Sequence, residues 1–135
     1  MNTFNETADE ALRAIWQRAE ELNMKGVALV AASQGDRVQS WLSKMLVVGT
    51  MKKGPSQNEP EMNLIAIAYS KAAEMADTLQ ASGGRTSPLK GEFGWRGGVI
   101  ARGKAGYLFA AFSGGRSTDD VIAAQAGLDI LVRTL

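Results

Sequence analysis

The chain has 135 residues, enough for one domain with a sizeable core. Fifteen basic and fourteen acidic side chains leave a net charge of +1, so the overall charge favours neither nucleic acid nor a membrane surface. The chain has no cysteine or histidine, so it lacks thiolates, disulfides and the commonest general base and transition-metal ligand. No stretch approaches the roughly 20 apolar residues of a membrane span. The first residues are unlike a signal peptide, so we expect a cytoplasmic protein.

The first third of the chain predicts a helix followed by two strands. Apolar residues recur at helical spacing over residues 7–22, which gives that helix one buried face. Residues 27–32 form a continuous apolar run of strand length, typical of a central strand covered on both faces. The tight turn at 34–36 then predicts a hairpin partner over residues 37–45.

The middle of the chain predicts a second helix between two irregular segments. Residues 49–61 contain two prolines, two glycines and two adjacent lysines, a composition typical of a mobile loop. An alanine-rich helix is predicted from about Met62 to Ala81. Residues 83–97 carry five glycines together with Phe93 and Trp95, and form the longest irregular stretch.

The last third predicts a hairpin and a terminal helix. Residues 99–101 and 107–112 are two apolar runs joined by a short polar turn. Ser113-Gly114-Gly115 ends the second strand, because glycine adopts backbone angles that other residues avoid. Ser117 is the predicted N-cap of the final helix, and Asp119-Asp120 places two acids where the helix dipole favours negative charge.

This order of elements predicts the fold class. Helices alternate with pairs of strands that are joined as hairpins, which favours an antiparallel sheet over a doubly wound parallel one. We therefore expect a single α+β domain over residues 1–135, with an antiparallel sheet of about five strands and helices packed on it.

Several short segments together carry a family resemblance. They are Ala68–Ala72, Gly97-Gly98-Val99, the run 107–112, Ser113-Gly114-Gly115, Asp119-Asp120 and Ala126-Gly127. In this order they resemble the GlcG/HbpS-like family, often called haem-degrading domain proteins. The resemblance implies a profilin-like fold, frequent homo-oligomerisation and, in some members, a haem or corrinoid-associated role. No histidine is present to serve as an axial haem ligand, and Tyr69 and Tyr107 are two side chains that could ligate iron in principle.

A cluster of basic residues suggests a binding site. Residues 80–117 hold six basic side chains and one acid, Glu92. One interpretation is a solvated surface. The other is a site for a small carboxylate metabolite or haem propionates, because the arginine fork can bond both carboxylate oxygens. Thr86 and Ser87 are included among the candidates because the resemblance implies a hydroxyl residue after the second helix. The candidate ligand-binding residues are Arg85, Thr86, Ser87, Trp95, Arg96, Ser113, Gly114, Gly115 and Arg116.

Catalysis has little support in the sequence. Residues 98–104 have the spacing of a phosphate loop, but Ala105 replaces the Mg²⁺-binding hydroxyl and a strand follows, so a hairpin turn is predicted. Ser113 has no histidine base in the chain and no nucleophile elbow. Asp119 and Asp120 are adjacent and predicted to cap a helix, which also argues against an anion at that helix end.

The sequence thus favours a non-enzymatic small-ligand-binding or accessory protein of the GlcG/HbpS-like type, taking a tetrapyrrole or a small carboxylate, with no nucleic-acid partner. The alternative is a structural or interaction module that forms a homo-oligomer without a ligand. In that case Phe93 and Trp95 would anchor a neighbouring subunit.

Overall fold

The computed structural model describes residues 3–55 and 60–135 of the chain, which form three helices and two antiparallel sheets. Their bounds in chain order are α1 Thr3–Glu21, β1 Gly26–Ser33, β2 Trp41–Val48, β3 Lys52–Lys53, β4 Met62–Asn63, α2 Leu64–Thr78, β5 Gly98–Arg102, β6 Tyr107–Ser113 and α3 Ser117–Thr134.

The main sheet has four strands in the order β2-β1-β6-β5, and each neighbouring pair is antiparallel. β1 is central: Ala28 lies opposite Leu46 of β2 and Phe112 of β6. β3 and β4 form a separate two-stranded ribbon. The predicted α+β class and antiparallel sheet are therefore confirmed, with four main strands and a short ribbon in place of about five strands.

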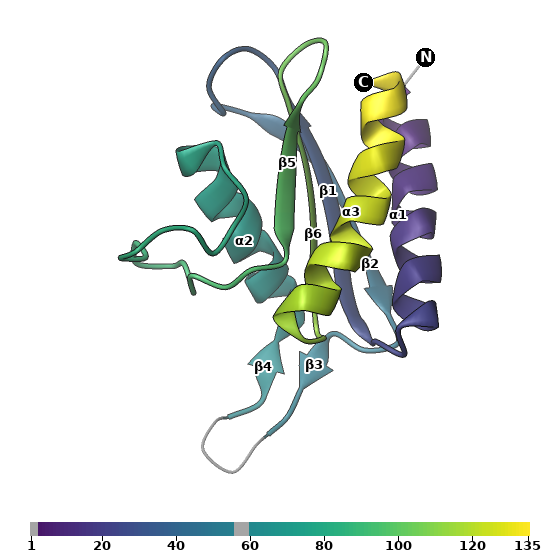
Figure 1. Ribbon diagram of the computed structural model, residues 1–135, viewed down its shortest axis with the longest axis vertical. Helices are drawn as coiled ribbons and strands as arrows, with labels where there is room; N and C mark the ends of the chain where they lie inside the picture. The colour runs from purple at the N-terminus through teal and green to yellow at the C-terminus, as the bar shows by residue number, and fades with distance from the viewer. Residues whose placement is uncertain (1–2, 56–59) are drawn as a thin grey trace.

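Helices cover both faces of this sheet. α1 and α3 run side by side on one face, and α2 lies on the other (Figure 1). Successive β1 residues point to opposite faces. Ala28 and Val30 pack in the α1–α3 layer, whereas Val27 and Leu29 pack with α2. This two-sided burial explains why β1 is apolar at almost every position.

Close contact between α1 and α3 depends on Gly127. A Cβ added at this position would lie 2.6 Å from Cγ1 of Ile15, which is fully buried, and 3.3 Å from the carbonyl oxygen of Ala11. The small residue therefore lets two helix backbones approach closely beneath the sheet.

The structure corrects several predicted boundaries. α1 begins at Thr3 instead of residue 7, and β2 spans Trp41–Val48 instead of 37–45, because residues 34–40 form a longer loop than the tight turn expected. α2 begins at Leu64, where the Asn63 side chain accepts hydrogen bonds from two backbone amides. It ends at Thr78 instead of about Ala81, and the C-cap residue Leu79 has a left-handed φ of 56°.

Two further predictions concern loops and membranes. The hairpin predicted for residues 99–101 and 107–112 is confirmed as β5–β6, so the phosphate-loop spacing belongs to a strand pair. The predicted mobile loop at 49–61 includes β3 and falls partly on residues 56–59, which lie outside the described part of the chain. Among the described helices, none has the length and apolar character needed to cross a membrane.

Replacing Gly127 with alanine tests the helix contact. Helix propensity alone favours alanine by about 1 kcal/mol. Overpacking against Ile15 costs about 1–3 kcal/mol, so we expect Gly127→Ala to lower the free energy of unfolding, measured by urea denaturation. A stabilised Gly127→Ala variant would show that α1 and α3 are not in close contact there.

Candidate functional site

A small polar pocket lies at the end of the sheet where β6 leads into α3. It has a volume of about 70 Å³ and is closed by parts of α2, the β3–β4 ribbon and the segment before β5. Its lining residues are Lys53, Met62, Leu64, Ile67, Lys71, Trp95, Arg96, Ser113, Gly114, Gly115, Ser117 and Asp120.

One wall of the pocket contains a buried ion pair between α2 and α3. The Lys71 and Asp120 side chains are only 3% and 6% exposed, and Nζ lies 3.2 Å from Oδ2. Lys71 Nζ also donates a hydrogen bond to the Phe112 carbonyl oxygen at 2.7 Å. The other carboxylate oxygen of Asp120 accepts a hydrogen bond from the Gly115 amide at 2.9 Å. The pair thus connects α2, β6, the turn after β6, and α3.

Burial and pairing act in opposite directions on these two groups. Burial lowers the pKa of Lys71, and the charge of Asp120 opposes this shift. Burial likewise raises the pKa of Asp120, and the charge of Lys71 opposes it. Each charge therefore makes the other tolerable in a site with little water.

Gly97 makes room for the lysine. Its φ is +129°, and a Cβ there would collide with Lys71 Nζ and lie 2.8 Å from the Phe112 carbonyl oxygen. The Gly97 carbonyl also accepts a hydrogen bond from the Phe112 amide at 3.0 Å. Gly97, the residue before β5, therefore lets the backbone pass directly over the buried amine.

The predicted cap of α3 is wrong. Arg116, not Ser117, occupies the N-cap, and no side chain there accepts a hydrogen bond from the helix. Asp120 does not cap the helix either, because it turns inward to Lys71 and to the Gly115 amide. The first turn of α3 therefore begins beside the pocket, at Ser117, without a side-chain cap.

Ser113 places an unpaired hydroxyl at this site. The residue is 1% exposed and lines the pocket, and its Oγ has no hydrogen-bond partner among the described residues. Phe109 and Ala111 of the same strand pack toward α2, so alternation along β6 puts the Ser113 side chain on that face as well. A buried hydroxyl without a partner costs free energy, which a bound ligand would recover.

A wider groove of about 310 Å³ adjoins the pocket. The two cavities share Lys53, Leu64, Gly114 and Gly115, and the groove adds Lys25 and Lys52. Lys53 stands at the junction, where Nζ donates to the Gly114 carbonyl oxygen at 3.3 Å. Across both cavities, five cationic side chains face a single acid, Asp120, among the lining residues.

The structure brings five of the nine sequence-predicted site residues together. Trp95, Arg96, Ser113, Gly114 and Gly115 all line the small pocket.

The other four lie outside the pocket. Arg85 is engaged by acids of its own neighbourhood: it donates to Asp77 at 2.6 Å and pairs with Glu92 at 2.9 Å. Thr86 and Ser87 are exposed, and so is Arg116.

Sequence reasoning missed the lysines of the site and the partner of Asp120. In the sequence, Lys52 and Lys53 belong to a predicted loop, and Lys71 belongs to a segment that carries the family resemblance. A signal for Lys71 was present, because it follows Leu64 and Ile67 at helical spacing and thus falls on the buried face of α2.

The described residues contain no group of three or more acidic side chains, histidines or cysteines that could hold a metal ion. Comparison of the sequence with family models and with curated proteins finds no match to either.

Removing one partner of the ion pair should destabilise the protein strongly. Asp120→Asn leaves the buried Lys71 without a counter-charge, so we expect a loss of about 3–5 kcal/mol in the free energy of unfolding. Asp119→Asn is the matched control, because the nearest charged partner of Asp119 is the exposed Arg116, at 3.9 Å, so its ion pair is weak. This variant should lower the free energy of unfolding by less than about 1 kcal/mol.

The loss in the free energy of unfolding caused by Asp120→Asn should also depend on pH. Burial lowers the pKa of Lys71, and the variant removes the charge that raised it. When the pKa of a lysine is lower in the folded state, the unfolded state binds more protons. The free energy of unfolding therefore rises as pH increases from the folded pKa to the ordinary value of about 10.4. The gap to wild type should therefore narrow in urea denaturation at alkaline pH. A gap that widened with pH would contradict burial as the cause.

Proposed function

We propose that this chain is a non-enzymatic accessory protein of the GlcG/HbpS-like type, located in the cytoplasm, that binds a small carboxylate. The observation that supports this most directly is the buried, unpaired Ser113 hydroxyl on the wall of a pocket that Lys53, Lys71 and Arg96 also line.

The charges around the pocket favour an anion. Lys71 is neutralised by Asp120, but Arg96 makes no ion pair or hydrogen bond within the described part of the chain. A carboxylate in the pocket can accept from the Arg96 fork and from the Ser113 hydroxyl. The first turn of α3 has no side-chain cap and begins beside the pocket, so its backbone amides can donate to the anion. Asp119 and Asp120 lie in the same turn and offset the helix dipole, so these amides contribute as hydrogen-bond donors.

The size of the pocket favours a carboxylate over a tetrapyrrole. Its volume of about 70 Å³ equals that of roughly two water molecules, whereas pockets for cofactor-sized ligands measure about 300–1,000 Å³. The rest of a longer ligand would extend into the lysine-lined groove.

The two tyrosines offer no iron site in this pocket. Tyr69 is hydrogen-bonded to Ser43, and Tyr107 lies under the guanidinium of Arg102; neither lines the pocket or the groove.

The geometry also favours binding over catalysis. Lys71 is the one buried amine of the pocket wall, and it already donates to Asp120 and to the Phe112 carbonyl oxygen. Its amine is thus engaged by groups of the fold, which favours a structural role over that of a general base.

Amide chemical shifts test this function. Malonate added to ¹⁵N-labelled protein should cause saturable shifts at Gly114, Gly115 and Ser117. Arg96→Ala should weaken binding about 10- to 100-fold, because it removes a hydrogen bond to a charged group. Arg133→Ala removes the same charge from the last turn of α3 and serves as the control. Equal affinity of both variants, or no saturable shift at these amides, would contradict the proposal.

One observation favours the alternative, a module that assembles without a ligand. Phe93 and Trp95 stack with ring centroids 5.0 Å apart, yet they are 49% and 41% exposed. Exposed aromatic pairs of this kind often anchor a neighbouring subunit.

Phe93→Ser separates assembly from binding, because Phe93 does not line the pocket. If the aromatic pair holds subunits together, the variant should lower the mass measured by sedimentation velocity while leaving the malonate shifts intact. A mass equal to that of wild type would remove this pair from any interface.

A further inference from the structure

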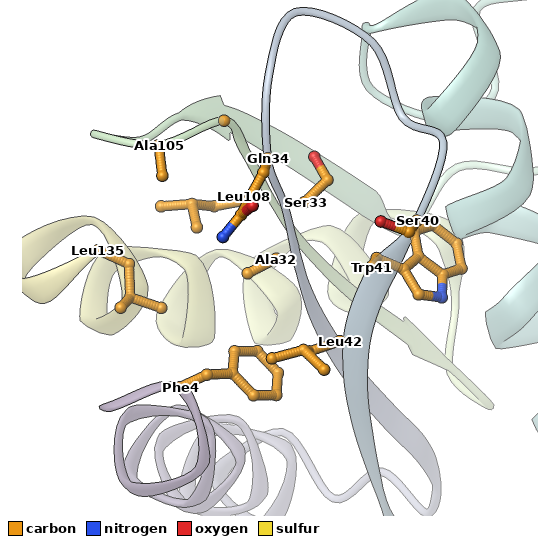
Figure 2. Close-up of a pocket in the computed structure, with 11 residues that line it drawn as sticks. Phe4, Ala32, Ser33, Gln34, Ser40, Trp41, Leu42, Ala105, Leu108 and Leu135 are labelled. Atoms are coloured by element: carbon orange, nitrogen blue, oxygen red, sulfur yellow. The ribbon is translucent and has the colours of Figure 1, made fainter. Parts of the chain in front are cut away.

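A second and larger cavity lies at the opposite end of the sheet from the polar pocket. It has a volume of about 500 Å³ and opens between the first turn of α1, the end of α3 and the loops that join β1 to β2 and β5 to β6 (Figures 1 and 2). None of its lining residues belongs to the polar pocket or the basic groove.

Its walls are mainly apolar and carry no ionisable side chain. Phe4, Ala32, Leu42, Leu108 and Leu135 surround the space in Figure 2. Leu42 remains 58% exposed although its strand position faces the α1–α3 layer, because no side chain of the described residues fills the cavity in front of it.

Two polar side chains at the rim have hydrogen-bonding capacity to spare. Gln34 and Ser40 line the cavity, and within the described residues neither side chain has a hydrogen-bond partner. An apolar wall with a few polar groups is the usual composition of a small-molecule site, and 500 Å³ lies within the usual range of about 300–1,000 Å³.

The walls on the loop side are fixed by hydrogen bonds. The Gly35 amide donates to the Ala105 carbonyl oxygen at 2.8 Å, and the Tyr107 amide donates to the Ser33 hydroxyl at 3.2 Å. The two loops approach so closely that a Cβ at Gly106 would collide with the backbone of Ser33.

The end of α3 is fixed in the same way. The Lys104 amide donates to the Leu135 carbonyl oxygen at 2.7 Å, which holds this residue at the cavity wall. The cavity is therefore formed before any ligand arrives, which lowers the entropic cost of binding.

We infer that this cavity binds an uncharged, largely apolar small molecule that hydrogen-bonds to Gln34 and Ser40. The absence of any ionisable side chain among the lining residues disfavours a charged ligand, since its charge would lose hydration without a partner. This site is independent of the carboxylate pocket, because the two share no lining residue.

The shape of the site argues for a small molecule and against a second copy of the chain. The apolar surface is concave and lies between two helix ends and two loops. The exposed apolar side chains of β2 nearest to it, Met45 and Val47, point to the other face of the sheet. A flat interface between copies would need these side chains on the same side as Leu42.

Titration with the neutral dye Nile red tests the site. Wild-type protein should bind the dye saturably, with increased and blue-shifted emission. Leu42→Asp puts a charge on the cavity wall at an exposed position and should weaken binding at least tenfold. Met45→Asp is the matched control: it lies on the same strand, is 38% exposed and lines another surface, so its affinity should equal that of wild type.

A second variant separates filling of the cavity from an effect of charge. Ala105→Phe occupies the space from an exposed turn and should also weaken dye binding, with an unchanged circular dichroism spectrum. The inference is overturned if wild type binds no dye, if Met45→Asp weakens binding as much as Leu42→Asp, or if Ala105→Phe leaves binding unchanged. It is also overturned if Leu42→Asp lowers the sedimentation mass, because the cavity would then be an interface between copies.

Discussion

The buried pair of Lys71 and Asp120 is the interaction on which the candidate site depends. It joins α2 on one face of the sheet to α3 on the other. Lys71 also donates a hydrogen bond to the Phe112 carbonyl oxygen near the end of β6. The Gly115 amide is held by the same carboxylate. Because Asp120 is used in this way, it is not available to cap α3, and the helix begins open beside the pocket.

The regular parts of the fold could be predicted because their signals are local. Short apolar runs are enough to predict β1 and the β5–β6 hairpin, and two glycines indicate where β6 ends. The β3–β4 ribbon had no such signal: each strand has two residues, and Lys52–Lys53 has no apolar alternation. The start of α3 was misplaced because its first turn depends on an inward-facing aspartate whose partner is 49 residues away.

The candidate site was predictable only in part for the same reason. The glycines after Ser113 and the nearby arginines indicate a site where β6 meets α3. Trp95 and Arg96 do line the pocket at this place. Arg85 has the same residue type, but Asp77 and Glu92 engage it, and these contacts cross a loop whose path the sequence does not specify. Lys71 stands among alanines, which suggests a solvated helix face. Its spacing from Leu64 and Ile67 instead places it on the buried face of α2.

We propose that the Ser113 hydroxyl, which has no partner among the described residues, serves a bound carboxylate and not the fold. Thermal unfolding of wild type and Ser113→Ala, with and without malonate, tests it most directly. Without malonate, the two midpoints should agree or the variant should be higher, because its methyl group needs no partner. Malonate should raise the wild-type midpoint and raise that of Ser113→Ala less. An equal rise in both, or a variant destabilised in the absence of malonate, would contradict the account.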